Sequence, residues 1–352
     1  MALYRSNLIQ SEIIEASLAA VWPHLDACTL NGKRIFITGG TGFFGLWLLA
    51  ALACLNRDHA DITVTVLSRD PVRFLSHNPH WNSLPWLTFT AGNVRDFAFP
   101  PGHFDMLIHA ATDTSMDAHA QPLSLFDDIV LGSRRVLDFA INAGVTRSLL
   151  ISSGAVYGPQ PLGFSHIPDD AAIACQTQLA SSAYGEGKRV MEMLGSLYQH
   201  QSGIESIAAR CFAFVGPGLP LDGHFAIGNF IHDALFADTI RVKGDGSVMR
   251  SYLYGADLAV WLLHLLANGQ QGVSYNVGSD QGISIGELAF LVRDVLAPGK
   301  IVQIQNQLPV QNQTRNRYVP AIERAKSSLG LDVWTSIEDS LRQSARFIQA
   351  VV

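Results

Sequence analysis

Residues 34–45, RIFITGGTGFFG, decide the fold. The first five form a short apolar run typical of a buried strand, and a helix is predicted over 43–55. Of the three glycines between them, the first permits a sharp turn, the second lets the backbone approach a pyrophosphate, and the third lets the helix pack on the strand. We therefore predict a dinucleotide site at the helix N-terminus, where unpaired N–H groups favour negative charge. Its residues are Gly39, Thr41, Gly42, Phe43, Phe44 and Gly45.

Strand and helix patterns alternate along the chain beyond this stretch. The further strands are predicted over 62–67, 87–90, 106–109 and 148–152. Long helices are predicted over 123–143 and 181–200. Strands that alternate with helices indicate an α/β fold with a doubly wound parallel (Rossmann) sheet.

The second half of the chain has a looser pattern, which indicates a smaller C-terminal substrate lobe interleaved with the sheet. Glycines and prolines cluster in 216–223. Helices are predicted over 226–236, 256–266, 285–296 and 337–347, and an extra N-terminal helix over 9–21. The predicted division is an N-terminal helical extension (1–31), a Rossmann domain (32–212, with 240–268 returning to it) and a substrate-binding lobe (213–239 and 269–352).

Composition excludes several classes of protein. The chain has 352 residues, 48% of them hydrophobic and 15% charged, so it is not disordered. Its net charge of −6 argues against a nucleic-acid partner. The longest apolar run, 46–55, has ten residues against the roughly 18 needed to cross a bilayer, so no membrane span is expected. Four cysteines without C-x-x-C spacing predict no metal site, and without a secretion signal we expect a cytoplasmic protein.

The end of the second strand should meet the adenosine ribose of the cofactor. An acid usually holds a free 2′-hydroxyl there. Here Ser68 and Arg69 follow the strand, and no acid occurs before Asp70. A hydroxyl and a guanidinium suit a 2′-phosphate, so we favour NADP over NAD. Alternatively, Arg69 stacks on the adenine, and the site would then bind NAD equally well.

The next two strands also end in candidate cofactor contacts. Asn93 and Val94 follow the third strand, and Asn93 either bonds the adenine edge or forms a turn. His109, Ala110 and Ala111 close the fourth strand, where small residues let the backbone approach the cofactor. His109 itself is expected to be a packed, hydrogen-bonded residue.

A candidate catalytic group follows the fifth strand. SSGAVYG covers 152–158, and Tyr184 and Lys188 come about 30 residues later on one face of a predicted helix. A free tyrosine has a pKa of about 10, and a nearby ammonium together with an oxidised nicotinamide favours its phenolate. A strand-end serine can bind the same substrate oxygen. These residues are predicted to move the proton of an alcohol while its hydride passes to the cofactor.

With these motifs the chain resembles an extended short-chain dehydrogenase/reductase of the NAD-dependent epimerase/dehydratase family, from about residue 32 onward. The resemblance rests on TGGTGFFG, HAA, SSGAVYG, YGEGK, Arg210 with Val215-Gly216-Pro217, GDGSVMRSYLYGADLA and Tyr275-Asn276-Val277-Gly278. It implies a catalytic triad of Ser153, Tyr184 and Lys188, of which the last two also contact the cofactor. It further implies a nucleoside diphosphate sugar as substrate, and a homodimer that pairs through helices 123–143 and 181–200.

Two departures from the family pattern narrow the implied reaction. Sugar-nucleotide 4,6-dehydratases carry an Asp-Glu pair directly after the serine or threonine, and decarboxylating relatives keep the Glu. Here those positions are Gly154 and Ala155. We therefore expect hydride chemistry at a carbinol or ketone carbon, C4 of the sugar: 4-epimerisation, 4-keto reduction or alcohol oxidation.

The resemblance also implies five substrate-binding residues, in different parts of the chain. Ser153 faces the reacting oxygen, Arg250 and Arg317 occupy positions suited to clamp a diphosphate, and His224 and Asn229 open a lobe helix toward the sugar. Surface salt bridges and helix capping or packing are the alternatives for the last four. Ala213 replaces a common family asparagine, which leaves open an NADPH-dependent reductase of a non-nucleotide ketone or aldehyde. A non-catalytic cofactor-sensing protein is a third hypothesis.

Overall fold

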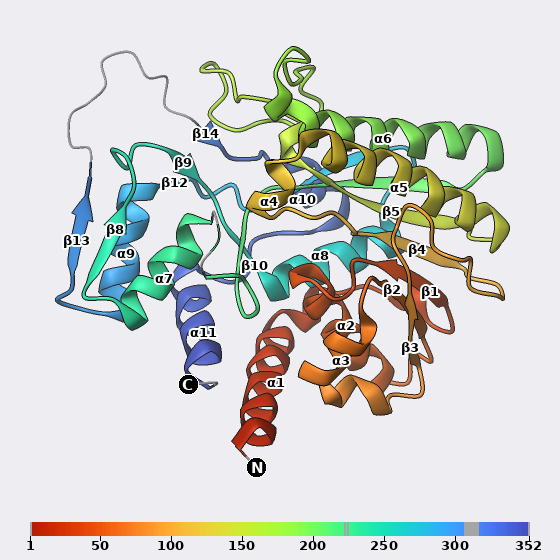
Figure 1. Ribbon diagram of the computed structural model, residues 1–352, viewed down its shortest axis with the longest axis horizontal. Helices are drawn as coiled ribbons and strands as arrows, with labels where there is room; N and C mark the ends of the chain where they lie inside the picture. The colour runs from red at the N-terminus through yellow and green to blue at the C-terminus, as the bar shows by residue number, and fades with distance from the viewer. Residues whose placement is uncertain (1, 222, 224, 306–316, 351–352) are drawn as a thin grey trace.

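The computed structural model describes residues 2–221, 223, 225–305 and 317–350. Its centre is a seven-stranded sheet, parallel throughout, in the order β11-β6-β5-β4-β1-β2-β3 (Figure 1). The strands are β1 (Arg34–Thr38), β2 (Thr63–Ser68), β3 (Leu87–Ala91), β4 (Met106–His109), β5 (Arg147–Ser153), β6 (Glu205–Cys211) and β11 (Ser274–Val277). The strand order reverses between β1 and β4, which creates a crevice at their carboxyl ends. The predicted doubly wound parallel sheet is confirmed.

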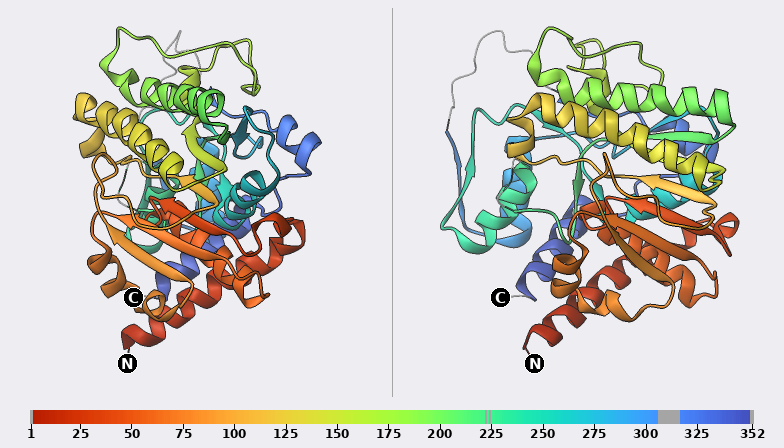
Figure 2. Two further views of the ribbon diagram at one scale, coloured as in Figure 1. Left: turned by 90° about the vertical axis from the view of Figure 1, so that its right-hand side faces the viewer. Right: turned by 45° about the vertical axis from the view of Figure 1, so that its right-hand side comes forward.

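Helices cover both faces of this sheet (Figure 2). α5 (Pro122–Asn142) and α6 (Ala183–Ser202) cover one face, and α2 (Phe43–Arg57) and α8 (Gly255–Asn268) cover the other. α8 is apolar on nearly every side and fully buried, because α1 (Ala2–Val21) packs on it from outside. None of the helices in the described ranges combines the length and the apolar character needed to cross a membrane.

The smaller lobe has its own apolar core, built on small sheets. β8 pairs with β13, β9 lies between β12 and β14, and β7 pairs with β10. Its elements are β7 (Phe214–Val215), α7 (Ala226–Phe236), β8 (Thr239–Val242), β9 (Met249–Arg250), β10 (Leu253–Tyr254), β12 (Ile283–Ser284), α9 (Ile285–Leu296), β13 (Ile301–Ile304), β14 (Arg317–Tyr318) and α11 (Ile337–Gln349). Short helices α3 (Pro71–His77), α4 (Met116–His119) and α10 (Glu323–Leu329) complete the fold.

The strand pairing differs from the predicted division of the chain in two places. β11, which the sequence assigns to the lobe range 269–352, is the edge strand of the central sheet. β8, inside the range 240–268 expected in the Rossmann domain, pairs with β13 of the lobe instead. Both are four-residue strands, too short for their periodicity to indicate a partner. The N-terminal helix begins at Ala2, earlier than predicted, and packs on α8 and α11.

Candidate active site

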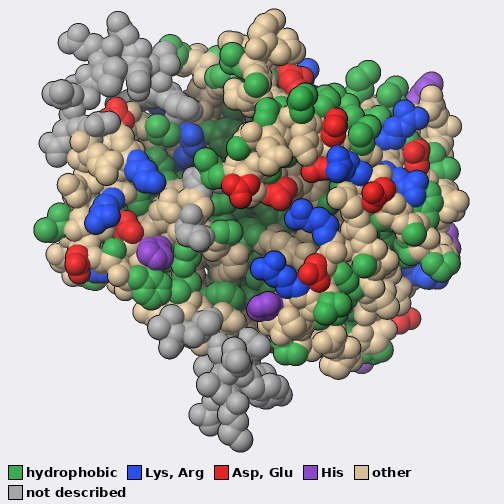
Figure 3. All heavy atoms as spheres, in the orientation of Figure 1, with side chains coloured by type: hydrophobic (Ala, Val, Ile, Leu, Met, Phe, Trp, Pro, Cys, Tyr) green, Lys and Arg blue, Asp and Glu red, His purple; other side chains and the backbone are tan. Residues whose placement is uncertain are grey.

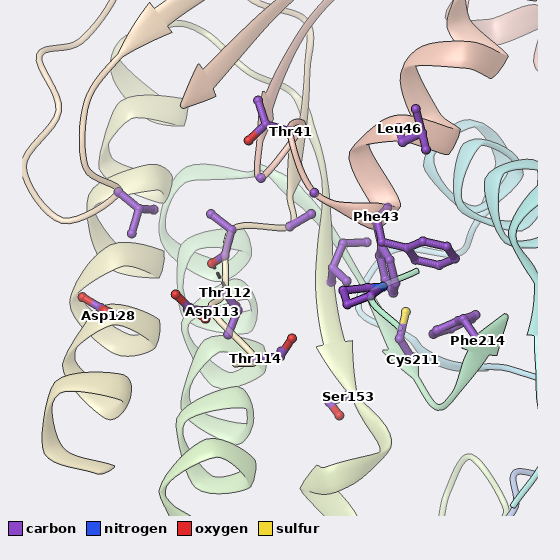
Figure 4. Close-up of a pocket in the computed structure, with 18 of the residues that line it drawn as sticks. Thr41, Phe43, Leu46, Thr112, Asp113, Thr114, Asp128, Ser153, Cys211 and Phe214 are labelled. Atoms are coloured by element: carbon purple, nitrogen blue, oxygen red, sulfur yellow. Dashed lines mark hydrogen bonds between the residues drawn. The ribbon is translucent and has the colours of Figure 1, made fainter. Parts of the chain in front are cut away.

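A cleft of about 850 Å³ opens at the carboxyl ends of the central strands and extends to the lobe. Figure 3 shows it as a hollow with apolar side chains inside and charges of both signs at its rim. In the close-up of Figure 4, Phe43, Leu46 and Phe214 lie on one side, while Thr112 and Asp113 lie on the other. Open α/β sheets bind their ligands at this position, where the strand order reverses.

The glycine turn forms one wall of the cleft. Gly39 has φ +76°, and a Cβ there would lie 2.6 Å from the carbonyl carbon of Ala110. A Cβ on Gly45 would lie 2.1 Å from the backbone of Gly40, so α2 packs on the turn only with glycine at this position. A Cβ on Gly42, the N-cap of α2, would lie 3.7 Å from the Gly39 carbonyl oxygen, which is an ordinary contact. Gly42 leaves the first N–H groups of the helix without a side-chain cap. The cradle therefore fits the pyrophosphate of a dinucleotide, and Thr41, Phe43 and Phe44 line the cleft beside it.

The end of the cleft where the sequence predicts the adenosine lies at β2 and β4. Ser68 and Arg69 line it, and Nη2 of Arg69 lies 3.6 Å from Oδ2 of Asp113. The Arg69 side chain is 74% exposed. The Asp70 carboxylate accepts a hydrogen bond from the Arg73 N–H (2.9 Å), since Asp70 is the N-cap of α3. The nearest acid after β2 is thus engaged in capping a helix.

The structure separates the remaining predicted cofactor residues into two groups. Asn93, Val94, Ala110 and Ala111 line the cleft. His109 lies behind the wall: its ring nitrogens contact Oγ1 of Thr38 (2.8 Å) and Oγ of Ser133 (3.1 Å). Burial, and secondarily the charge of Lys188, lowers the pKa of His109 to about 3, so the ring is neutral. A direct contact between His109 and a cofactor is not part of this arrangement.

Ser153, Tyr184 and Lys188 meet at the end of the cleft. Ser153 is the last residue of β5, and the other two lie in the first turns of α6. Lys188 is only 3% exposed, and its Nζ donates to the Ile151 carbonyl oxygen and to Oγ1 of Thr112, both at 2.7 Å. The Ser153 hydroxyl is close enough to the Tyr184 phenol to lower its pKa, and the Tyr184 ring centroid lies 6.0 Å from Nζ.

Burial is the main influence on the pKa values of Tyr184 and Lys188. It raises the pKa of Tyr184 to about 12, against a smaller lowering by the Ser153 hydroxyl. It lowers the pKa of Lys188 to about 8. The lowering predicted from the sequence depends on the ammonium together with an oxidised nicotinamide. By itself, the Lys188 ammonium directs its protons at Thr112 and Ile151 instead of the phenol. In this structure Tyr184 is therefore a neutral phenol, ready to act as an acid.

A buried network holds the serine end of β5 from behind. The Ser152 hydroxyl donates to Glu192 of α6, which also pairs with Arg210 of β6 (2.7 Å). Arg210 Nη1 donates to Oη of Tyr157 (2.8 Å) in the 3-10 turn Gly154–Tyr157. The network ties β5, β6 and α6 together, which fixes where Ser153 lies.

The predicted substrate residues lie farther out. Arg250 on β9 and Arg317 on β14 come from paired strands but are not among the side chains that line the cleft in the described ranges. Asn229 is a half-buried residue of α7 that likewise does not line it. His224 lies outside the described residues.

Among the cleft-lining residues that the sequence did not single out are Thr112, Cys211, Phe212 and Tyr318. Thr112 accepts from Lys188, and Cys211 and Phe212 come from the end of β6. Tyr318 reaches Ser153 from the lobe, with 3.5 Å between the two oxygens. Thr112 directly follows the predicted HAA motif, and that is the one signal that points to it. No group of three or more His, Cys, Asp or Glu side chains that could hold a metal ion occurs in the described part of the chain.

Together, the glycine-lined cleft at the strand-order reversal and the serine, tyrosine and lysine at its end define the class: an extended short-chain dehydrogenase/reductase. The chain belongs to the NAD dependent epimerase/dehydratase family, whose model matches residues 35–278. It is therefore an enzyme of the NAD-dependent, extended short-chain dehydrogenase type.

Sequence relatives include UDP-glucuronic acid decarboxylase 6 of Arabidopsis thaliana, 28% identical over 88% of this chain and 87% of the relative. UDP-glucuronic acid decarboxylase 1 of Xenopus tropicalis is 27% identical over 90% of this chain and 72% of the relative. Among solved structures, the dTDP-glucose 4,6-dehydratase DesIV of Streptomyces venezuelae, with NAD and TYD bound, is similar with a TM-score of 0.75. It is 23% identical, and the match covers 90% of this chain and 97% of that one. These structural likenesses support the fold.

Proposed function

We propose that the enzyme transfers a hydride at a carbinol or ketone carbon, C4, of a nucleotide-activated sugar, either as a 4-ketoreductase or as a 4-epimerase. One observation carries the proposal: Ser153, Tyr184 and Lys188 meet at the end of the dinucleotide cleft, and no acid follows the serine. The names of the relatives support a nucleoside diphosphate sugar as the substrate class.

The roles of the three side chains follow from their contacts. When bound, the nicotinamide supplies or accepts the hydride. In the reductive direction the Tyr184 phenol donates its proton to the carbonyl oxygen, because its raised pKa keeps it protonated. Ser153 holds that oxygen beside the phenol. Lys188 carries a charge below its pKa of about 8, which stabilises the phenolate left on Tyr184 until a proton returns.

Elimination of water is not part of the proposal, because the required acid–base pair is missing. Gly154 and Ala155 occupy the two positions after the serine. At position 154 even a Cβ would lie 2.7 Å from Phe212 Cζ and 2.7 Å from the Tyr318 hydroxyl. The same absence of a carboxyl group at position 155 disfavours the decarboxylation that the names of the sequence relatives suggest.

We propose NADP as the preferred cofactor, with NAD as the alternative. Arg69 lines the adenosine end and keeps its guanidinium largely exposed, while Asp70 caps α3. A guanidinium there suits a 2′-phosphate, and no acid faces the ribose from the end of β2. Asp113 lies beside Arg69 and holds it at the cleft.

Two arginines of the smaller lobe are candidates to bind the nucleotide end of the substrate. Arg250 is a desolvated guanidinium with a pKa below its usual range, and its Cζ lies 5.8 Å from the centroid of the Tyr318 ring. We assign it, with Arg317, to the diphosphate. A reductase of a non-nucleotide ketone is the second candidate, favoured by Ala213 and by aromatic residues such as Phe214 and Phe225 in the cleft.

We also propose a homodimer that pairs through α5 and α6. Both helices carry large apolar side chains that face solvent in the single chain. These are Leu123, Leu131 and Ile141 on α5, and Met193 and Leu197 on α6. Exposed apolar residues gathered on two adjacent helices are typical of a subunit interface.

The test is a panel of UDP-, dTDP-, GDP- and CDP-hexoses and their 4-keto-6-deoxy forms, each assayed with NADPH and with NAD⁺. Nicotinamide absorbance and NMR of the product report hydride transfer and the configuration at C4. Tyr184→Phe should reduce kcat by roughly 10²–10⁴-fold, the range for a lost general acid. Turnover of simple ketones alone, with every nucleotide sugar inert, would refute the substrate class.

A further inference from the structure

Tyr318 enters the reaction centre from the smaller lobe. It lies on β14 beside Arg250 of β9, and its ring packs on Phe212 with 4.6 Å between centroids. Its Oη lies 3.5 Å from Oγ of Ser153. The ring reaches this position because residue 154 is glycine, since a Cβ there would lie 2.7 Å from the Tyr318 Oη. Tyr318 thus occupies space that the side chain after Ser153 would otherwise fill.

The number of hydrogen bonds that the Ser153 hydroxyl can form limits what its contact with Tyr318 can be. A serine hydroxyl donates one proton and accepts two hydrogen bonds. The backbone N–H of Ala155 donates to Ser153 Oγ at 3.1 Å and fills one acceptor position. Tyr318 faces the same oxygen and can fill the second. The 3.5 Å separation is long, and such contacts tighten in an active site when substrate binds.

With both acceptor positions filled, the Ser153 proton can point only to the remaining partner. That partner is the Tyr184 oxygen, or the substrate oxygen that shares it. We propose that Tyr318 is a positioning residue which, by donating to Ser153, fixes the serine as a hydrogen-bond donor toward the reacting oxygen. This role rests on the proposed function for its substrate, but the hydrogen-bond geometry is independent of it.

Tyr318 must keep its proton to play this part. Burial holds its pKa well above the usual range, so the phenol is a donor at neutral pH. The titratable groups around it are Tyr184 on α6, Cys211 on β6 and Arg250 on β9, and Lys188 acts on Cys211 from behind. Of these, Arg250 opposes the rise, while Tyr184 and Cys211 add to it. The arrangement assigns one phenol, Tyr184, to proton transfer and the other to orientation.

A double-mutant cycle tests the proposal. Tyr318→Phe is made in the wild type and in the Ser153→Ala background, and kcat and KM are measured with whichever carbonyl substrate the enzyme reduces. In the wild type the change should lower kcat by about tenfold and leave KM within about twofold, as expected for one oriented hydrogen bond. In Ser153→Ala it should have almost no effect, because the acceptor is gone. Tyr252→Phe, the same substitution beside Arg250 but outside the cleft lining, is the control.

The same four proteins and the control are compared by urea unfolding without any ligand. The two hydroxyls should show a coupling of about three- to tenfold in the unfolding equilibrium constant, the range for one hydrogen bond. A merely structural role would make Tyr318→Phe equally costly in both backgrounds. Equal losses of kcat, or no coupling on unfolding, overturn the proposal. Unfolding coupling together with inert nucleotide sugars would instead overturn only the proposed substrate class.

Discussion

Lys188 offers a quantitative test of how this site is built. The side chain is 3% exposed, and burial lowers its pKa from 10.5 to about 8. At about 1.4 kcal/mol per pKa unit, this difference means that the buried charge costs the folded state roughly 3 kcal/mol near neutral pH. The perturbation is Lys188→Met, which keeps much of the volume of the side chain and removes the charge.

The sign of the pH dependence follows from linkage. The folded-state pKa is lower than the unfolded one, so between about pH 8 and 10.5 the unfolded chain binds more protons. Wild-type stability therefore rises with pH in this window as the penalty is relieved. The variant loses the hydrogen bonds to Ile151 and Thr112, but that cost is the same at every pH. The change with pH in the stability difference between wild type and variant therefore reports only the effect of the Lys188 charge.

The assay is urea unfolding of the wild type and the variant at pH 7 and pH 9.5. Relative to the variant, the wild type should gain about 2 kcal/mol of unfolding free energy between the two. Lys300→Met is the control, because Lys300 also donates to backbone carbonyl oxygens but is only half-buried. If wild type and Lys188→Met differ by the same amount at both pH values, Lys188 is not a desolvated ammonium and the reasoning fails.

Further predictions concern the turn, the cofactor and the subunit contact. Gly45→Ala should lower the unfolding free energy, measured in urea, by about 3 kcal/mol, because the added Cβ would lie 2.1 Å from the Gly40 backbone. Gly42→Ala should fold normally and weaken dinucleotide binding, which a fluorescence titration measures. Arg69→Ala should weaken NADPH binding by about 10- to 100-fold with little effect on NADH, and calorimetry that finds both unchanged would exclude the 2′-phosphate assignment. Leu131→Glu with Met193→Glu should convert the dimer to a monomer in light scattering, and a wild-type monomer would contradict the proposed interface.

The central sheet could be predicted because its signals are local. Residues 34–45 carry a strand, a turn and a helix start, and each glycine in the turn has a steric reason that the structure reproduces at Gly39 and Gly45. The spacing of Tyr184 and Lys188 on one helix likewise required no knowledge of the rest of the fold. The pairing of β8 with β13 and of β11 with β6 could not be predicted, because the partners of such short strands are decided by long-range packing.

The titration of the site could not be predicted from residue types alone. The spacing of Tyr184 and Lys188 predicts that the ammonium, together with an oxidised nicotinamide, lowers the phenol pKa. Burial and the direction of the lysine protons set that pKa in the protein alone. Thr112, which takes one of those protons, lies 76 residues from Lys188 in sequence. His109 shows the converse case, where a strand-end histidine beside the cleft is a neutral, buried partner of Thr38 and Ser133.

Gly154 supports one conclusion in the sequence and a second one in the structure. In the sequence it is an absence, since an acid found in dehydratases is missing and a reaction is thereby disfavoured. In the structure the same glycine is what admits the Tyr318 phenol, which lies 3.5 Å from the Ser153 oxygen. Restoring an acid at 154 would displace the phenol as well as add a carboxylate, so such a variant would lose the orientation of Ser153. Gly154 and Tyr318 are therefore expected to change together if the chemistry of this site changes.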